Sequence, residues 1–338
     1  MSINNILKNI QIFALSAGNG SGSKLFQSLI DKSDGLAMLP GYQLQYLCPF
    51  YEEWSKDKIL NWTKIIDKIF YQFPGIFDSR ISSGNEKLDR LGEEEKKYII
   101  IDKNKFKKFF LKFSENLVLN RRNLILIIHL AYMRCLEKDI QNTKVILFHI
   151  HVPWYIENFF LKDFPDGKII SMTREPKNNI FSRYKTSYLK AEELKLRKSD
   201  FFLVRYRAAY NVFKYITTGL NVVPKKLKND HFVIKHEQLK YSLKNSVTEI
   251  LKKMNINFNE NNYQPTFNGL LWNDQFYSTK KYDESNIVKA NFDNVYSENK
   301  NLNFVLEGIL SELYSKLKYR KTLFSNTFIN NMKLFILI

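Results

Sequence analysis

The stretch IQIFALSAGNGSGSKLFQSLID, residues 10–31, decides the fold class of this chain. Its opening run, IQIFALS, is short, continuous and apolar and leads into glycines, which is typical of a strand buried on both faces of a parallel sheet. After the glycines, Leu25, Phe26 and Leu29 recur at helical spacing. A strand, a glycine loop and a helix thus follow one another within about twenty residues, as in the units of an α/β domain.

The rest of the chain continues this alternation. We expect helices from Pro153, from Pro176 and over residues 242–254. Short apolar runs predict further strands at residues 35–41, 144–151, 167–173 and 231–236. The alternation predicts a three-layer α/β fold with a mainly parallel central sheet, in which ligands bind at the carboxyl ends of the strands.

Residues from about 49 to 138 differ in character and predict a helical insert, within a single expected domain over residues 1–338. The most apolar helix candidate there is RRNLILIIHLAYMRCLEK, which we expect to pack on the sheet. In KNKFKKFFLKF, residues 103–113, lysines alternate with phenylalanines, a pattern that suits a nucleic-acid surface if the rings stack on bases. Periodic phenylalanines in a helix more often face a core, and we favour that interpretation.

Composition narrows the classes of function. The 338 residues are 44% hydrophobic and 25% charged, so the chain can bury a core. A formal net charge of +18 points to an anionic partner, such as nucleic acid, a membrane surface, a phosphorylated cofactor or an acidic polysaccharide. Cys48 and Cys135 are too few for a disulfide scaffold, so we expect a reducing, cytoplasmic compartment. The N-terminus is a poor signal peptide, and no stretch reaches the roughly 18 to 20 apolar residues of a membrane span.

The glycine loop is the first chemical signal. Gly18, Gly20 and Gly22 allow positive φ angles and a close approach of the backbone to a ligand. The helix that follows presents unpaired N–H groups and a partial positive charge to an anion. Hydroxyl donors and one full charge come from Ser21, Ser23 and Lys24. The pattern is not Walker A, because Ser23 separates Gly22 from Lys24, and an ordinary nucleotide triphosphatase is disfavoured. A tight turn without a ligand is the alternative.

The second signal is TREPKNNIFSRYK, which follows the strand expected at 167–173. Its turn and helix could place Arg174 and Ser182 around one dianion, the guanidinium giving two bonds and the hydroxyl a third. The alternative is a solvated turn in which Arg174 pairs with Glu175. Together with the loop, this motif indicates a nucleotide that carries phosphates at two places.

At these residues the chain resembles the sulfotransferases that use 3′-phosphoadenosine 5′-phosphosulfate (PAPS). GSGSKLFQSLID is similar to their 5′-phosphosulfate loop, and REPKNNIFSRYK to their 3′-phosphate motif, including the Arg-to-Ser spacing. KVILFHIHVP resembles the strand ending Lys-Thr-His-Leu-Pro of cytosolic members, and IKHEQLKYSLKNSVTEILKKMNI the later strand, Glu-Asp-Leu and helix. The resemblance covers roughly residues 10–257.

The resemblance implies a P-loop-like sulfotransferase fold and an enzyme that moves a sulfuryl group from PAPS, the co-substrate, to an acceptor. The acceptor would offer a hydroxyl or an amine, as a carbohydrate or small molecule does, and no metal would be needed. In this family pattern, His151 falls on the catalytic histidine and His149 on a lysine. The positions that match the family's donor-binding residues are Gly20, Ser21, Gly22, Ser23, Lys24, Arg174 and Ser182.

The chain departs from the family pattern at two charges. His149 in place of the family's lysine leaves the acceptor pocket one fixed charge fewer, and the second departure lies in the glycine loop. Family members usually carry Lys or Arg directly before the Ser-Gly of the loop, where this chain has Gly20. Lys24 stands instead where Thr is common. We interpret Lys24 as the catalytic cation, because its flexible stem could reach the phosphosulfate bridge from the first helical turn.

The histidines supply a candidate base. His149 and His151 lie two apart in a strand and therefore face the same side. The pair also allows a metal site, but no third ligand has suitable spacing, so we expect no metal. As general base, His151 would take the proton from the acceptor hydroxyl. We expect His129 to be a hydrogen-bonded core residue, and His231 and His236 to lie at the surface or to pack at the ends of a strand.

Two other classes of function stay open. A P-loop nucleotide kinase would need Mg²⁺ and would hydrolyse ATP. A basic nucleic-acid-binding protein would bind with an affinity that falls steeply with salt. We expect neither a nucleic-acid partner nor a transmembrane segment.

Overall fold

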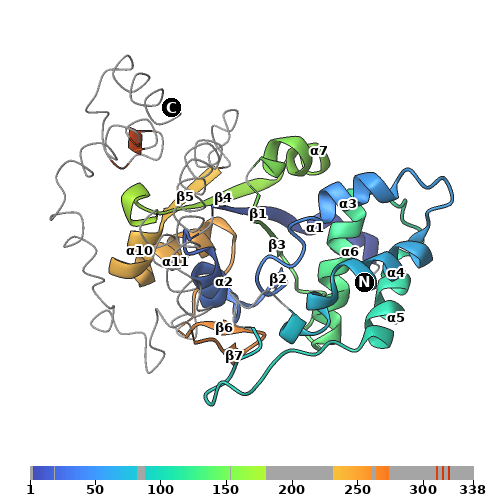
Figure 1. Cartoon of the computed structure of the whole chain (residues 1–338), viewed down its shortest axis with the longest axis horizontal. Coiled ribbons are helices and arrows are strands. Elements are labelled where there is room, and N and C mark those ends of the chain that lie inside the picture. Colours follow the sequence, from blue (N-terminus) through green and yellow to red (C-terminus); the bar gives the residue numbers. More distant parts are fainter. Residues whose placement is uncertain are drawn as a thin grey trace, which may run out of the picture.

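The structure is a computed structural model that describes residues 3–18, 20–81, 88–152, 154–179, 231–259 and 264–273, together with residues 310, 314, 315 and 319. Its strands are β1 (Gln11–Ala17), β2 (Leu36–Met38), β3 (Val145–Ile150), β4 (Lys168–Thr173) and β5 (His231–Lys235). They form one all-parallel sheet in the order β2-β3-β1-β4-β5 (Figure 1). The α/β fold class with a mainly parallel central sheet is confirmed.

β1 occupies the middle of this sheet because it is apolar on both faces. Every residue of β1 after Gln11 is buried. Leu15 lies beside His149 of β3 on one side and beside Ile170 of β4 on the other. The chain leaves β1 for β2 at one edge, returns to β3, and then crosses β1 to reach β4. The segments after β1, β3 and β4 therefore meet where the direction of winding reverses, which is where ligands bind in open α/β sheets.

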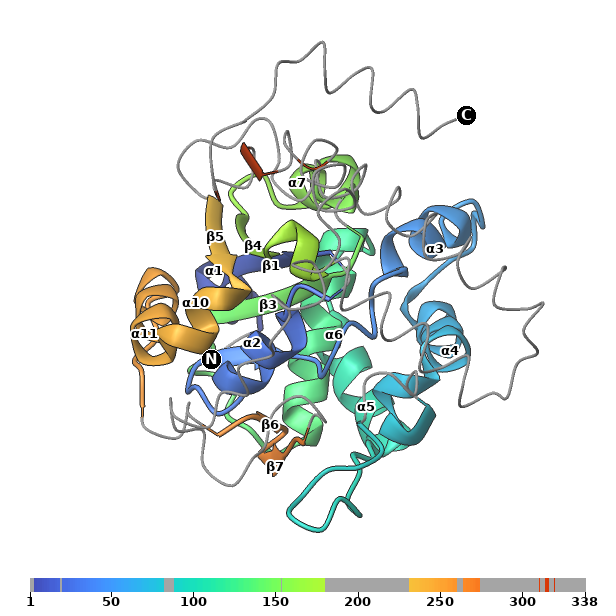
Figure 2. The same cartoon turned by 60° about the vertical axis from the view of Figure 1, so that its left-hand side comes forward.

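Helices flank the sheet, and most lie where the sequence predicts them (Figures 1 and 2). The helix expected from Pro153 starts as a π-helical turn, and the helix expected over 242–254 is present and packs against the helix after the glycine loop. These helices are α1 (Ile3–Asn9), α2 (Ser23–Ile30), the π turn η3 (Ile156–Phe160), α7 (Leu161–Asp163), α10 (His236–Tyr241) and α11 (Leu243–Lys253).

A small antiparallel hairpin of β6 (Thr266–Phe267) and β7 (Leu270–Leu271) lies next to α2 in both views (Figures 1 and 2). The buried carboxylate of Asp31, at the end of α2, accepts a hydrogen bond from Thr266 Oγ1 at 2.9 Å and another from the Gly269 amide at 2.8 Å. Burial raises the pKa of this carboxyl group. The hairpin is thus fastened to the helix that carries the glycine loop.

The segment between β2 and β3 is helical, as the sequence predicts for residues 49–138. Its helices gather on one side of the sheet (Figures 1 and 2). Within the described residues they are α3 (Leu47–Trp54), α4 (Trp62–Gln72), the 3₁₀ turns η1 (Pro74–Ile76) and η2 (Ser79–Ile81), α5 (Lys103–Ser114) and α6 (Arg121–Cys135). A single domain over the whole chain stays a prediction.

The phenylalanines of α5 face the core. Phe106 and Phe110 are fully buried, Phe106 with its ring centroid 5.0 Å from that of Phe77 and Phe110 with its centroid 5.7 Å from that of Trp62. Lys108, between them in sequence, is exposed. The core interpretation of the basic, aromatic stretch is therefore confirmed, and these rings are not available to stack on bases.

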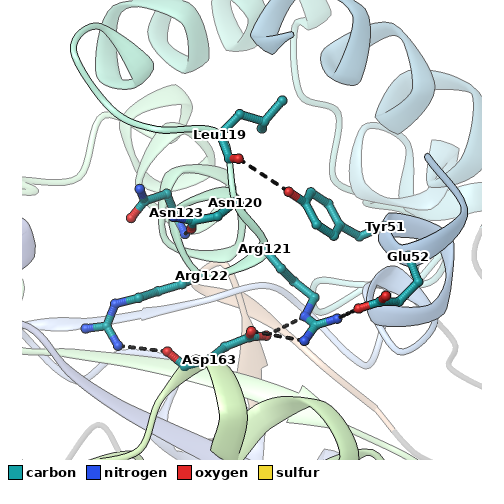
Figure 3. A network of polar contacts seen from close by, with 8 residues as sticks. All are labelled: Tyr51, Glu52, Leu119, Asn120, Arg121, Arg122, Asn123 and Asp163. Atoms are coloured by element: carbon teal, nitrogen blue, oxygen red, sulfur yellow. Dashed lines mark hydrogen bonds and ion pairs between the residues drawn. The ribbon is translucent and has the colours of Figure 1, made fainter. Parts of the chain in front are cut away.

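Arg121 joins the insert to the chain that follows β3 (Figure 3). Its guanidinium, 8% exposed, donates to Asp163 from Nε at 2.5 Å and from Nη2 at 3.0 Å, and from Nη1 to the Glu52 carboxylate. Asp163 belongs to α7 and Glu52 to α3. Bidentate, largely buried pairs of this kind hold their partners in one geometry. Arg121 therefore fixes α3, which comes after β2, relative to α7, which comes after β3.

Candidate functional site

The glycine loop directly follows β1. Gly20 and Gly22 adopt positive φ angles of 76° and 86°, and Gly22 is the residue from which α2 starts. A Cβ atom at Gly22 would lie 2.3 Å from Cδ2 of His236. Residue 22 must therefore be glycine for two reasons, its backbone conformation and the lack of space. The loop turns the chain sharply and leaves the first N–H groups of α2 at the carboxyl edge of the sheet.

Ser21 braces this loop. Its hydroxyl donates to the Gly18 carbonyl at 2.6 Å, and its side chain is 2% exposed. Ser23, the first residue of α2, is also buried. The structure thus brings all the loop residues singled out in the sequence to one turn, with the Ser21 hydroxyl engaged by the loop itself.

Lys24 lies in the first turn of α2 and is directed toward two neighbours. Its Nζ is 5.8 Å from the centroid of the Trp272 ring, which is buried just after β7. Its charge also contributes to lowering the pKa of His149, behind the larger effects of burial and of His151. The ammonium group therefore acts on the space between the hairpin and the end of β3.

The two histidines at the end of β3 have different surroundings. His149 is 4% exposed, and its Nδ1–H donates to the Gly41 carbonyl at 3.1 Å. Burial, the neighbouring His151 and the Lys24 charge lower the pKa of His149 to about 3, so this imidazole is neutral at physiological pH. His151 is half-buried, its ring centroid 5.8 Å from that of His149. His151 is thus the more accessible of the pair.

Arg174, directly after β4, lies beside the glycine loop. Its side chain is largely buried, and Nη1 lies 3.4 Å from the Gly20 carbonyl, a long hydrogen bond across two strand ends. Residues 176–179 are helical, and the Glu175 carboxylate caps them by accepting from the Asn178 amide at 2.7 Å. Ser182 lies outside the described residues, so its pairing with Arg174 stays a prediction.

The end of β5 adds residues that the sequence did not assign to the site. His236 is buried against Gly22, as described above, and Glu237 accepts a hydrogen bond from the Glu175 amide at 2.9 Å. His236 therefore does pack at a strand end, as expected, but its partner is the glycine loop. The stretch IKHEQL, in which charged and polar residues directly follow a strand, was the signal available in the sequence.

Two tyrosines from far along the chain also reach these strand ends. The Tyr314 hydroxyl donates to the Glu175 carboxylate, and the Tyr319 hydroxyl donates to Glu237 Oε2 at 2.8 Å. Glu175 directly follows Arg174 in sequence, and Glu237 accepts a hydrogen bond from the Glu175 amide. These two tyrosines thus support the turn after β4.

Several buried polar atoms at this edge have no hydrogen-bond partner within the part of the chain that the structure describes. They include Ser16 Oγ near the end of β1, His149 Nε2 near the end of β3, and both side-chain polar atoms of Asn179 in the helical turn after β4. Burying such an atom without a partner costs about 1 to 3 kcal/mol. Their gathering at three adjacent strand ends is expected of a place that holds a polar ligand or water.

Comparisons with known proteins find similarity to solved structures only at a low level. No protein-family model matches it, and no curated protein matches it. Among solved structures it is similar to a sulfotransferase domain from the curacin biosynthetic pathway, with 19% identity, a TM-score of 0.36, and coverage of 76% of this chain and 77% of that one. A similarity of this size carries no weight for function. The function proposed below therefore depends on the residues of this chain.

The described residues contain neither a metal-binding cluster nor a membrane-spanning helix. Within the described ranges, no three or more His, Cys, Asp or Glu side chains are grouped so that they could hold a metal ion. In the same residues, none of the helices combines the length and the hydropathy needed to cross a bilayer.

The arrangement has two chemical parts. Around the start of α2, backbone N–H groups, Lys24 and the Arg174 guanidinium offer donors and positive charge to an anion. One strand away, His151 presents a half-buried imidazole, a group suited to moving a proton near neutral pH. An anionic group held by the first part would lie beside a base in the second.

Proposed function

We propose that this protein transfers a sulfuryl group from PAPS to a hydroxyl or amine of an acceptor. The observation that carries the proposal is the adjacency of three motifs: the glycine loop after β1, with the histidine pair of β3 on one side and the Arg174 turn of β4 on the other. A donor with phosphates at two places needs two anion-binding elements next to each other, and an acceptor hydroxyl needs a base next to the reacting phosphosulfate.

The donor would bind across β1 and β4. The N–H groups at the start of α2, in the turn formed by Gly20, Ser21, Gly22 and Ser23, would take the 5′-phosphosulfate, because a helix N-terminus favours an anion. Arg174 and Ser182 would hold the 3′-phosphate through charged and neutral hydrogen bonds. These interactions mainly position the donor, and the half-buried surroundings strengthen them.

The transfer step would use Lys24 and His151. The acceptor oxygen attacks sulfur, a new S–O bond forms, and the bond from sulfur to the bridging phosphate oxygen breaks. The acceptor's proton passes to the His151 imidazole, and the leaving group is 3′,5′-bisphosphoadenosine. Lys24 would stabilise the negative charge that grows on the leaving phosphate, a form of electrostatic stabilisation related to that in phosphoryl transfer.

A binding experiment tests the donor. Thermal unfolding is measured with 3′,5′-bisphosphoadenosine, with ATP and Mg²⁺, and with short oligonucleotides, because a ligand of the folded state raises the melting temperature. We expect the bisphosphate to give the largest shift. A larger shift with ATP and Mg²⁺ would favour a kinase, and a salt-sensitive shift with oligonucleotides alone would favour nucleic-acid binding.

A transfer experiment tests the reaction. The protein is incubated with ³⁵S-labelled PAPS and a panel of phenols, sugars and amines, and labelled product is separated from donor. We expect label on at least one acceptor class, with release of an equal amount of 3′,5′-bisphosphoadenosine. Tight bisphosphate binding without any transfer across the panel would contradict the proposed reaction. It would still support the proposed nucleotide-binding site.

A further inference from the structure

The turn after β2 contacts both imidazoles at the end of β3. The Gly41 carbonyl accepts the hydrogen bond from His149 Nδ1 at 3.1 Å. The Tyr42 ring lies nearly parallel to the His151 ring, with centroids 4.4 Å apart and planes inclined by 14°. The same tyrosine meets His149 edge-on, at 5.7 Å and 89°. Gly41 thus contacts His149 through a hydrogen bond, and the next residue, Tyr42, contacts His151 through a ring stack.

The sheet explains why this turn reaches the histidines. β2 pairs in parallel with β3, with Leu36 beside Val145 and Met38 beside Leu147. Continued at the same offset, this register brings residues 40–42 alongside residues 149–151. Gly41, with a φ angle of 67°, turns the chain there. The contacts between the turn and the histidines therefore follow from strand pairing, which also places the turn at the carboxyl edge of the sheet.

We propose that Tyr42 is a positioning residue for His151, an inference that rests on the proposed function. A parallel stack at this distance fixes the plane of the imidazole and restricts its rotation, so that its ring nitrogens point out from the side of the stack. When His151 takes a proton, the face of the phenol ring also stabilises the resulting cation. Tyr42 acts through His151 and need not touch the donor or the acceptor.

The surroundings of the pair support a role in orientation. Tyr42 and His151 are both half-buried, so part of the imidazole stays accessible in the stack. His149 is held by its own hydrogen bond to the turn and is neutral. Lys24, from α2, is a charged group that also acts on His149. Misplacing a catalytic group by about 1 Å can lower the rate about 100-fold. The orientation of His151 should therefore affect the rate of transfer.

The test compares Tyr42→Phe, which keeps the ring, with Tyr42→Leu, which removes it. Tyr46→Leu is the matched control, because Tyr46 follows in the same segment and its side chain is 47% exposed. Three quantities are measured: kcat with the best acceptor, KM for PAPS, and the NMR shifts of the His151 ring protons, assigned by comparison with His151→Gln. Melting temperatures show whether each variant is folded.

We expect Tyr42→Leu to lower kcat about 10- to 100-fold with KM for PAPS within about 2-fold of the starting value. The upfield ring-current shift of the His151 protons should disappear in this variant, because the phenol ring is gone. Tyr42→Phe should keep both the shift and most of the rate, and Tyr46→Leu should change neither.

Three outcomes would overturn the role of Tyr42. An unchanged His151 shift in Tyr42→Leu would mean that the rings do not stack in solution. A lost shift with an unchanged kcat would mean that the stack does not position the base. Wild-type protein that transfers no sulfuryl group to any acceptor would remove the proposed function, and the role of Tyr42 with it. A failure of the stack alone leaves wild-type transfer intact, so the two failures are distinguishable.

Discussion

The imidazole of His236 fills the space in which any residue other than glycine at position 22 would place its Cβ atom. The separation between that position and His236 Cδ2 is 2.3 Å, well inside van der Waals contact. The start of α2 and the end of β5 are therefore fitted to each other through one glycine and one histidine. The loop that would bind the donor depends on a residue two strands away in the sheet.

We predict that Gly22→Ala destabilises the protein and abolishes the donor site. The positive φ angle alone should cost about 1 to 3 kcal/mol, and the overlap with His236 should add a similar amount. The free energy of unfolding in urea measures the effect. Gly269→Ala is the matched control, because Gly269 has a φ angle of 75° but nothing within 4 Å of an added Cβ.

The overlap can be separated from the strain by a second substitution. In the double variant Gly22→Ala with His236→Ala, the space is restored and only the backbone strain remains. We expect the double variant to be more stable than the sum of the two single changes predicts. Strictly additive free energies would show that the contact between these residues does not limit the loop.

Arg174→Ala should weaken the binding of 3′,5′-bisphosphoadenosine by roughly 1.5 to 3 kcal/mol, the value of a lost charged hydrogen bond. Adenosine 5′-phosphosulfate, which lacks the 3′-phosphate, should lose far less. Calorimetric titration of both nucleotides measures the difference, with the exposed Arg122→Ala as control. Equal losses for both would place Arg174 at the phosphosulfate loop, where its contact with the Gly20 carbonyl lies.

Lys24→Met should lower the turnover rate more than the affinity for PAPS, because the charge that Lys24 stabilises grows in the transition state. Initial rates of ³⁵S transfer give kcat, and calorimetry gives the affinity. Lys32→Met, just beyond the other end of α2, removes the same charge away from the loop and should leave kcat unchanged. Full turnover in Lys24→Met would show that the leaving-group cation comes from another residue.

The sheet could be predicted from the sequence because each strand is a short apolar run bounded by glycine, proline or polar residues. The run at residues 10–16 became β1 at Gln11–Ala17, and the run at 144–151 became β3. Parallel pairing then brought Arg174 and His151 to the loop after β1 without any further signal. These placements depend on local patterns and on general rules of α/β winding, which a single sequence contains.

The contacts that shape the site could not be predicted in the same way. Gly41 and His149 lie 108 positions apart, and nothing in either segment marks the other as its partner. The packing of His236 on Gly22 depends on the pairing of β5 with β4 and on the angle at which α10 leaves the sheet. Such contacts arise from tertiary structure, which periodicity and motifs do not encode.

Stability should fall in mild acid through His129. Burial lowers the pKa of His129 from 6.5 to about 4, and its Nδ1–H donates to the Ile125 carbonyl at 2.7 Å. Between these two values the unfolded chain binds a proton that the folded chain does not, so the free energy of unfolding decreases as the pH falls, by roughly 1.4 kcal/mol per pH unit. In His129→Asn this contribution is absent. Urea unfolding from pH 4.5 to 7.5 measures both slopes, and parallel curves for the two proteins would contradict the prediction.

The two histidines of β3 should respond differently to removal. His149 is buried, and its pKa, lowered to about 3, makes it a much weaker base than an ordinary imidazole. His151→Ala should reduce turnover by roughly 10² to 10⁴ with PAPS affinity nearly unchanged, because general-base catalysis is lost.

His149→Ala should mainly lower the free energy of unfolding or the affinity for the acceptor, because it removes the hydrogen bond to the Gly41 carbonyl and leaves a cavity beside Tyr42. Transfer rates, donor affinity and urea unfolding of both variants, compared under the same conditions, separate these effects. Near wild-type transfer by His151→Ala would exclude this histidine as the base. Attention would then move to a carboxylate at the strand ends, where Glu175 and Glu237 already lie within hydrogen-bonding reach of one turn.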